Sequence, residues 1–351
     1  MFSSVSGREF RPLFAARVIG QVLPSAWNLL RAMMRPLGIE RTSVHLRQCL
    51  KTTAILLTLV AHPASAQLDP TPIVSSRPIQ TGISHELRSE VMGDIRQINI
   101  WLPPDYERSQ DRYNVVYLID GALDQDFHHI AGLAQLGSLS WTFGPLIVVG
   151  VQTRQRRAEL TPPAEDARYR SAFPDNGGAD RFRLFLEREV VPLIEGNYRA
   201  GPRRALMGES LAGLFVVDTL LKQHVLFHDY VAISPSLWWD DRRPMRDASR
   251  RLHKNVPMDR RLYLAIANEG GTMQEGIDLL REALSQQGAG SVTVRYSDRS
   301  ASATHSTIYH GAAEDALRWL YPMPPYDPGP TPWSMIEGAS PPSARPAQDQ
   351  Q

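Results

Sequence analysis

The stretch "RRALMGESLAGLFVVDTLL", from Arg203 to Leu221, decides the fold. A short apolar run leads into a serine flanked by small residues, and an apolar segment with helical spacing follows at once. This pattern is typical of a nucleophile elbow, because a sharp strand-to-helix turn that projects a serine leaves no room for large neighbours. The alternative interpretation is that Ser210 only caps the helix. The second small position of the motif is Ala212 rather than glycine.

Apolar runs typical of buried strands occur on both sides of this stretch. They are "NVVYLID" (114–120), "PLIVVGV" (145–151), "RRALMG" (203–208), "DYVAIS" (229–234), "RLYLAIA" (261–267) and "SVTVRY" (291–296). Runs that are apolar on both faces suit the strands of a mostly parallel sheet. Upstream, "ELRSEVMGDIRQINIWLPPDY" (86–106) predicts two antiparallel strands around a Gly-Asp turn.

Segments with helical spacing lie between these runs. The clearest are 180–198, 273–288 and 307–321. Strands that alternate with helices indicate right-handed crossovers and a sheet covered on both faces. The sequence therefore predicts an α/β domain with a mostly parallel central sheet over residues 84–321.

Both ends of the chain differ from this domain. Basic residues precede the apolar run "TTAILLTLVA" (52–61), and small residues follow it up to Ala66, so residues 1–66 are interpreted as a secretory signal with an N-terminal extension. The run is too short for a permanent membrane span. A retained anchor or a disordered basic arm is the alternative. Residues 67–83 are expected to be a linker, and the proline-rich tail 322–351 is expected to be disordered.

Charge and cysteine content argue against nucleic-acid binding and against disulfide or cysteine–metal chemistry. The first 66 residues hold eight basic and two acidic side chains, so their removal changes the formal charge from +1 to −5. A mildly acidic mature chain gives no electrostatic reason to bind nucleic acid. Cys49, the single cysteine, lies in the segment expected to be removed. The mature protein is therefore expected to have no disulfide and no cysteine metal ligand.

A serine hydroxyl is a weak nucleophile and needs a general base. His305 follows the last strand candidate, in the loop "SDRSASATHS", where the base is expected to lie. His310 falls inside the next helix and is interpreted as a surface residue. His128 and His129 come too early, because the chain order in α/β-hydrolases is serine, acid, histidine.

The acid that orients the base is expected after the penultimate strand. In "RLYLAIANEGG", Glu269 follows the strand, and two glycines allow a sharp exit. Asp240 and Asp241 after the preceding strand compete with it, and Asp298 is a more distant candidate. A solvated surface carboxylate remains the alternative interpretation of Glu269.

The developing oxyanion of acyl transfer needs hydrogen-bond donors. We expect one from the Leu211 N–H at the start of the helix and one from the Ala122 N–H, after the first central strand.

Two further features lie near the same edge of the sheet. Trp238 and Trp239 in "SPSLWWD" either contact an apolar acyl group or pack as a buried pair. Arg154, Arg156 and Arg157 either attract an anionic substrate or remain solvated loop charges.

The segments "INIWLPPDY", "VVYLIDG", "RRALMGESLAGLF", "AISPSLWWD" and "THSTIYHGAAEDALRWLY" together resemble the esterase D family of α/β-hydrolases, over residues 80–321. Within it they resemble the periplasmic branch that includes siderophore-trilactone esterases. The resemblance implies an α/β-hydrolase fold and a periplasmic or secreted serine esterase that acts on small-molecule esters without a metal or organic cofactor. It implies Ser210 as nucleophile, His305 as base and Glu269 as acid, although some siderophore esterases of this group are thought to use a Ser-His pair alone. Acyl transfer to an alcohol, or a non-catalytic binding role, are the alternatives.

Overall fold

The computed structural model describes residues 73–252, 259–286, 292–324 and 329–341. The predicted signal segment and residues 67–72 of the predicted linker lie outside these ranges. Residues 73–82 contain no helix or strand, and the first strand begins at Ile83. The described residues of the C-terminal tail are mostly exposed and include a 3-10 helix at Trp333–Met335. No helix within the described ranges is long and apolar enough to cross a membrane.

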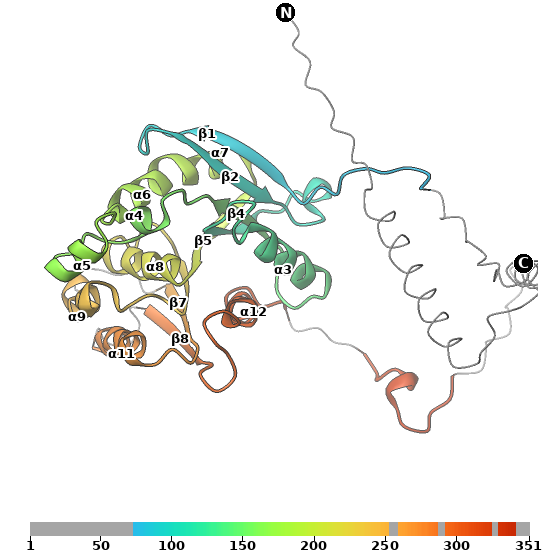
Figure 1. The fold of residues 1–351 in the computed structure, drawn as a ribbon. Coiled ribbons are helices and arrows are strands. Elements are labelled where there is room, and N and C mark those ends of the chain that lie inside the picture. The colour runs from blue at the N-terminus through green and yellow to red at the C-terminus, as the bar shows by residue number, and fades with distance from the viewer. Residues whose placement is uncertain (1–72, 253–258, 287–291, 325–328, 342–351) are drawn as a thin grey trace, which may run out of the picture. The chain divides into compact units, whose positions relative to one another are not determined.

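An eight-stranded sheet forms the centre of the domain (Figure 1). Its strands are β1 (Ile83–Arg88), β2 (Ile95–Trp101), β3 (Tyr113–Ile119), β4 (Leu146–Val151), β5 (Ala200–Glu209), β6 (Asp229–Ile233), β7 (Arg260–Ile266) and β8 (Val292–Asp298). The strand order is β1-β2-β4-β3-β5-β6-β7-β8. The β1–β2 and β2–β4 pairs are antiparallel, and every pair from β4 to β8 is parallel. Each strand predicted from the sequence is present.

Helices connect the parallel strands. They are α3 (Phe127–Leu139), α4 (Arg156–Leu160), α5 (Ala167–Ala172), α6 (Ala179–Phe185), α7 (Val191–Asn197), α8 (Leu211–Lys222), α9 (Arg243–Arg246), α10 (Ala248–Leu252), α11 (Gly271–Ser285) and α12 (Ile308–Leu320), with 3-10 helices at Tyr106–Arg108 and Trp239–Arg242. The helix predicted over 180–198 is divided by a π-helical turn at Leu186–Val190. Pro192, which has no N–H to donate, is the second residue after that turn.

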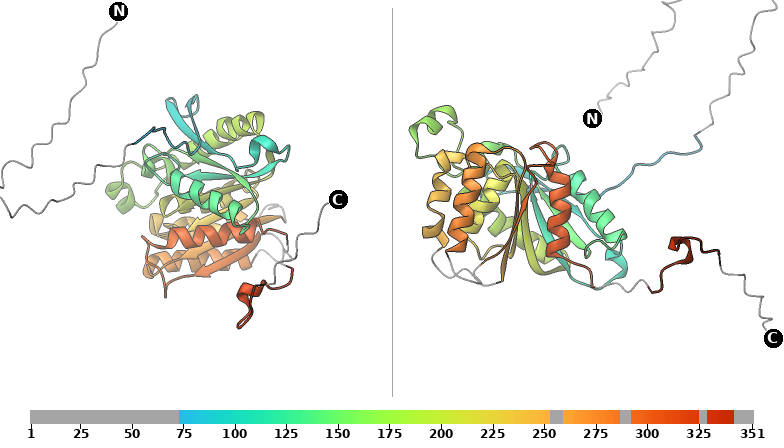
Figure 2. Two further views of the ribbon diagram at one scale, coloured as in Figure 1. Left: turned by 90° about the vertical axis from the view of Figure 1, so that its right-hand side faces the viewer. Right: turned by 90° about the horizontal axis from the view of Figure 1, so that it is seen from below.

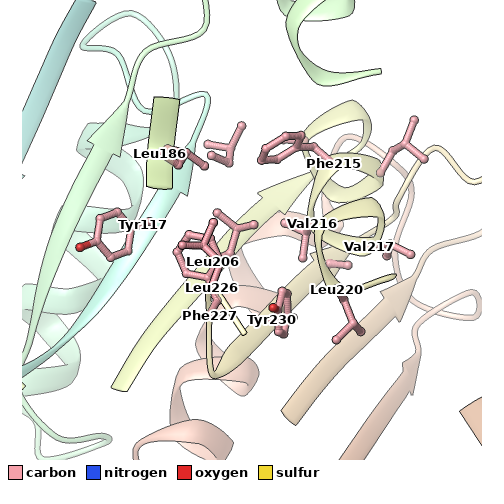
Figure 3. Close-up of a cluster of buried hydrophobic side chains, with 14 of the residues drawn as sticks. Tyr117, Leu186, Leu206, Phe215, Val216, Val217, Leu220, Leu226, Phe227 and Tyr230 are labelled. Atoms are coloured by element: carbon pink, nitrogen blue, oxygen red, sulfur yellow. The ribbon is translucent and has the colours of Figure 1, made fainter. Parts of the chain in front are cut away.

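The sheet separates two apolar cores, which confirms the predicted α/β-hydrolase architecture. Successive side chains of β3 point to opposite faces: Val115 and Tyr117 join the core under α6, α7, α8 and α11, whereas Val116 and Leu118 join the core under α3 and α12. Figure 2 shows these helix layers on the two faces of the sheet. Figure 3 shows part of the first core, where the side chains of α8 lie beside those of β5 and β6. Burying one such large side chain contributes about 1.5–3 kcal/mol.

The last strand differs from the others. Although β8 was predicted as a buried strand, its residues are exposed or half-buried. The reason is its position at the edge of the sheet, where β7 is its only neighbour in the strand order.

A buried carboxylate joins the amino ends of the central strands. Asp229, the first residue of β6, is fully buried and accepts hydrogen bonds of 2.6 to 3.1 Å from Arg203 and Arg261. The Tyr321 hydroxyl donates another at 3.1 Å. Burial alone would raise the pKa of Asp229, but the two guanidinium groups hold it below its ordinary value. This network ties β5, β6 and β7 together at the edge opposite to Ser210.

We expect Asp229→Asn to lower the free energy of unfolding by about 3–5 kcal/mol, because it leaves two guanidinium groups without their buried carboxylate. Since the pKa of Asp229 is lowered on folding, its contribution is present above the ordinary pKa of 3.8 and is lost as the pH falls through the folded value. Urea unfolding at neutral pH measures the change. Asp105→Asn, which alters an exposed ion pair with Arg108, is the control with an expected loss of about 0–1 kcal/mol. Equal unfolding midpoints for the two variants would contradict the prediction.

Candidate active site

Ser210 occupies a strained turn between β5 and α8. Its φ of 59° and ψ of −117° are unfavourable for a residue with a side chain, and such conformations persist where the surroundings enforce them. A Cβ on Gly208 would lie 2.6 Å from the Cβ of Ala212, and one on Gly213 would lie 3.0 Å from Pro235. The small residues of the motif are therefore required by close packing, and Ala212 is accommodated because Gly208 has no side chain.

The loops after β7 and β8 bring a carboxylate to a histidine. His305 Nδ1 lies 2.7 Å from Glu269 Oε1, and the side chain of Glu269 is 14% exposed. The contact is made across 36 residues of sequence because β7 and β8 are parallel neighbours whose carboxyl ends lie at the same edge. A carboxylate at Nδ1 fixes the imidazole tautomer that leaves Nε2 free to accept a proton.

The backbone and the surroundings keep Glu269 in place and ionised. Gly270 and Gly271 have φ values of 61° and 50°, a conformation that glycine adopts at little cost, and α11 begins there. Burial would raise the pKa of Glu269, but hydrogen bonding from His305 and from the neighbouring Ser234 hydroxyl lowers it overall. The carboxyl group is therefore negative at neutral pH and can stabilise an imidazolium.

The Ser210 hydroxyl is not yet bonded to the base. Within the described ranges, its partner is the hydroxyl of Ser236, with an Oγ–Oγ distance of 3.3 Å, and no hydrogen bond joins it to His305. In the absence of substrate, catalytic hydrogen bonds are often long and become short when the substrate binds. His305 itself is 44% exposed and accessible from solvent.

The two expected oxyanion donors differ in availability. The Leu211 N–H is at the first position of α8, at the positive end of the helix, and has no acceptor within the described part of the chain. The Ala122 N–H, by contrast, donates to Gln125 Oε1 at 3.0 Å. In this state the second donor is therefore occupied, and the side chain of Gln125 has to release it before it can serve an oxyanion.

The competing acids have other partners. Asp240 is buried and accepts hydrogen bonds from the backbone N–H groups of Glu165 and Asp166, at 2.9 to 3.2 Å. Asp241 pairs with Arg242 at 2.7 Å. Asp298 accepts from the Ser300 N–H at 2.9 Å. Of the four carboxylates considered from the sequence, Glu269 is the one that the structure brings to His305.

The paired tryptophans take different environments. Trp239 is fully buried, its indole N–H donates to the Pro162 carbonyl at 3.0 Å, and its ring packs on Phe173 and Tyr169. The expectation that it contacts substrate is therefore wrong for this state, because no part of its ring is accessible. Trp238, two residues after Ser236, is half-buried, packs on the same two rings and retains accessible surface.

The arginines after β4 are ion-paired. Arg154 contacts Asp94 at 3.1 Å and Arg157 contacts Asp175 at 3.0 Å. Arg156 donates to Asp120 at 2.6 Å and to the backbone carbonyl of Glu209, next to the nucleophile candidate, at 3.2 Å. The three side chains are 41 to 51% exposed, as expected for solvated charges, but each guanidinium also has a carboxylate partner. Arg156 in addition connects the ends of β3 and β5.

Two carboxyl groups near Ser210 have raised pKa values. Burial, with Asp126 and Glu269 as nearby carboxyls, raises the pKa of Glu209 from 4.5 to about 7, while His305 and Arg156 oppose the shift. Glu209 Oε1 is buried without a hydrogen-bond partner in the described structure. Burial, followed by the charge of Asp120, raises the pKa of Asp126 to about 6.

A raised carboxyl pKa makes the folded protein less stable as the pH increases. Between about pH 4.5 and pH 7, Glu209 is ionised in the unfolded chain but protonated in the folded one, so the free energy of unfolding falls across this window. Because the group is partly exposed, we expect a loss of about 1–2 kcal/mol. Glu209→Gln should remove this loss when unfolding is measured from pH 4.5 to pH 7. Parallel stability curves for variant and wild type would contradict the prediction.

Residues missed from the sequence complete the site. Ser236, Gln125 and Glu209 all lie within hydrogen-bonding or electrostatic range of the elbow or its donors. The sequence could have indicated them only by position, because each follows or ends a predicted strand at the edge of the sheet where the site lies. Within the described ranges, no group of three or more His, Cys, Asp or Glu side chains is arranged to hold a metal ion.

Known proteins are similar to this chain in sequence and fold. The siderophore enterobactin esterase of Emericella nidulans is 29% identical over 201 residues, which is 49% of this chain and 65% of that protein. The apo-salmochelin esterase of Escherichia coli is 32% identical over 155 residues, or 40% and 48% of the two chains. The crystal structure of an IroE-like serine hydrolase from Shewanella oneidensis has a TM-score of 0.61 at 29% identity, over 68% of this chain and 80% of that one.

These similarities concern the domain that carries the site. The chain spans 38 to 65% of the length of the curated relatives that it matches. The family model described as "putative esterase" matches residues 89–316, which include β2 to β8 and every residue of the candidate site. A match over more than half of the 351 residues establishes the family. The chain therefore belongs to the putative esterase family, in agreement with the resemblance of its motifs.

Proposed function

We propose that the protein is a serine carboxylic-ester hydrolase that acts through an acyl-enzyme. The observation that carries the proposal is the 2.7 Å contact between His305 and Glu269, at the carboxyl edge of the parallel strands where a serine occupies a strained elbow. The three residues follow the chain order serine, acid, histidine of α/β-hydrolases. No cofactor is part of the proposal.

In the proposed mechanism, Ser210 Oγ attacks the ester carbonyl while His305 Nε2 accepts the hydroxyl proton. Glu269 holds the imidazole and stabilises the imidazolium. The Leu211 N–H, and the Ala122 N–H after its release by Gln125, donate to the oxyanion. His305 returns the proton to the leaving alcohol and then activates water, which releases the acid and restores Ser210.

For the substrate, we infer a siderophore-type ester. The support is the name of several relatives, which include siderophore esterases of a fungus and of Escherichia coli. Trp238 comes two residues after Ser236 and is half-buried, and an aromatic side chain of this kind suits an apolar or aryl acyl group.

We further propose that the protein is exported to the periplasm or secreted. The support is the basic segment, the apolar run and the small residues that end at Ala66. Sequencing the N-terminus of the protein recovered from a periplasmic fraction tests this proposal. A chain that begins at Gln67 is expected, and an uncleaved chain in the cytoplasmic fraction would contradict it.

The test of the hydrolase uses the protein without residues 1–66 and a fluorophosphonate probe. We expect one adduct, on Ser210 by mass spectrometry, and hydrolysis of p-nitrophenyl butyrate and of an enterobactin-type trilactone. A lack of adduct on Ser210 would overturn the proposal. Added alcohols test acyl transfer, the alternative within the same chemistry, because a transferase would convert the ester into a new ester rather than an acid.

A further inference from the structure

The loop after β6 holds the elbow by its backbone. The Ser210 N–H donates to the Ile233 carbonyl at 3.0 Å, and the Ser236 N–H donates to the Ser210 carbonyl at 2.9 Å. Pro235, between these contacts, packs so closely on Gly213 that a Cβ there would come within 3.0 Å of the proline. Backbone hydrogen bonds and the packing of Pro235 therefore fix the position of Ser236 relative to Ser210.

The Ser236 hydroxyl faces the nucleophile. The residue is 3% exposed, and its Oγ lies 3.3 Å from Ser210 Oγ, its side-chain partner in the described structure. Its carbonyl is used separately, by the Trp239 N–H at 3.2 Å. Because a buried hydroxyl without a hydrogen bond is costly, the contact with Ser210 is the one that satisfies this side chain.

The direction of the hydrogen bond follows from the reaction. Each hydroxyl has one proton, and the proton of Ser210 has to reach His305 when the serine attacks. If Ser210 donated to Ser236, its proton would point away from the base. If Ser236 donates instead, it occupies a lone pair of Ser210 Oγ and leaves the proton of Ser210 for the imidazole.

We propose that Ser236 is a positioning residue of the reaction, whose hydroxyl donates a hydrogen bond to Ser210 Oγ and orients it for attack. This inference rests on the proposed hydrolase function. Ser236 keeps its own proton throughout. When the acyl-enzyme breaks down, Ser210 Oγ leaves with the electron pair of the ester bond, and Ser236 donates to the developing alkoxide until His305 returns the proton.

The experiment compares Ser236→Ala with Ser236→Thr, which keeps the hydroxyl. Ser89→Ala is the matched control, because Ser89 is equally buried and its hydroxyl also makes a hydrogen bond, but to Glu189. Ser89 follows β1, the edge strand that β2 separates from the parallel strands. We measure kcat and KM for p-nitrophenyl butyrate, the rate constant of fluorophosphonate labelling at Ser210, and thermal unfolding.

For Ser236→Ala we expect kcat and the labelling rate constant to fall together by about ten- to hundredfold, with KM little changed, since a hydrogen bond to a developing charge is lost. Ser236→Thr should retain most of the rate, and Ser89→Ala should retain kcat whatever its stability. A merely structural role for Ser236 would change the unfolding temperature but not the labelling rate of the folded protein.

Unchanged kcat and labelling in Ser236→Ala would overturn the inference. If this variant does not fold, Ser236→Cys, which is close in size and a weaker donor, has to show an intermediate loss for the inference to stand. Failure of the proposed function is distinguished at the outset, because the wild-type protein would then neither hydrolyse the ester nor label at Ser210.

Discussion

Ser210→Ala is expected to lower kcat by at least about 10⁴-fold for p-nitrophenyl butyrate, because no other group can form the acyl-enzyme. The KM should change little, since the ground state of the substrate does not depend on the serine hydroxyl. Fluorophosphonate labelling should disappear completely. The free energy of unfolding should fall by about 1 kcal/mol, because the buried Ser236 hydroxyl loses the 3.3 Å contact with Ser210 that satisfies it.

Ser140→Ala is the control for the serine variant. Ser140 is exposed at the end of α3, and its hydroxyl bonds the Leu136 carbonyl of the same helix. It should keep the activity and the labelling of the wild type. An alanine variant of Ser210 that still hydrolysed the ester would show that another residue or water attacks, and the acyl-enzyme mechanism would have to be abandoned.

Glu269→Gln is expected to lower kcat by about 10²- to 10⁴-fold. The glutamine amide is close to isosteric, but it carries no charge for the imidazolium, and its NH2 group can stabilise the wrong tautomer of His305. The remaining rate should come from the elbow and the oxyanion donors. Activity measured from pH 5 to pH 9 should stay low throughout, because a higher pH does not restore the missing charge.

Asp241→Asn is the matched control for the acid, since it removes a carboxylate of the same region that pairs with Arg242 instead of the histidine. It should keep kcat within about twofold of the wild type, because this carboxylate contacts Arg242 and not the histidine. Equal activities for Glu269→Gln and wild type would indicate that His305 works without an acid. A large loss in Asp241→Asn alone would move the acid to that position.

The sequence by itself predicted the local elements and their order. Apolar runs of strand length and helical spacing placed every strand within a few residues, because these periodicities are set by burial on one or both sides of each element. The small residues around Ser210 predicted the turn, since the steric requirement of an elbow is local. The order of elements then predicted Glu269 and His305 as acid and base. Both follow parallel strands, and the carboxyl ends of parallel strands lie at one edge of the sheet.

Only the tertiary structure could decide which candidates meet. Asp240 and Glu269 both follow a strand, yet one binds the amides of residues 165 and 166 and the other binds His305, and no local pattern distinguishes them. The burial of Trp239 and the ion pair of Arg156 could not be predicted for the same reason, because both depend on segments far away in the chain. Ser236 could not be identified from the sequence. Its hydroxyl oxygen lies 3.3 Å from that of Ser210, 26 residues away, because β5 and β6 end side by side, and neither sequence segment shows this alone.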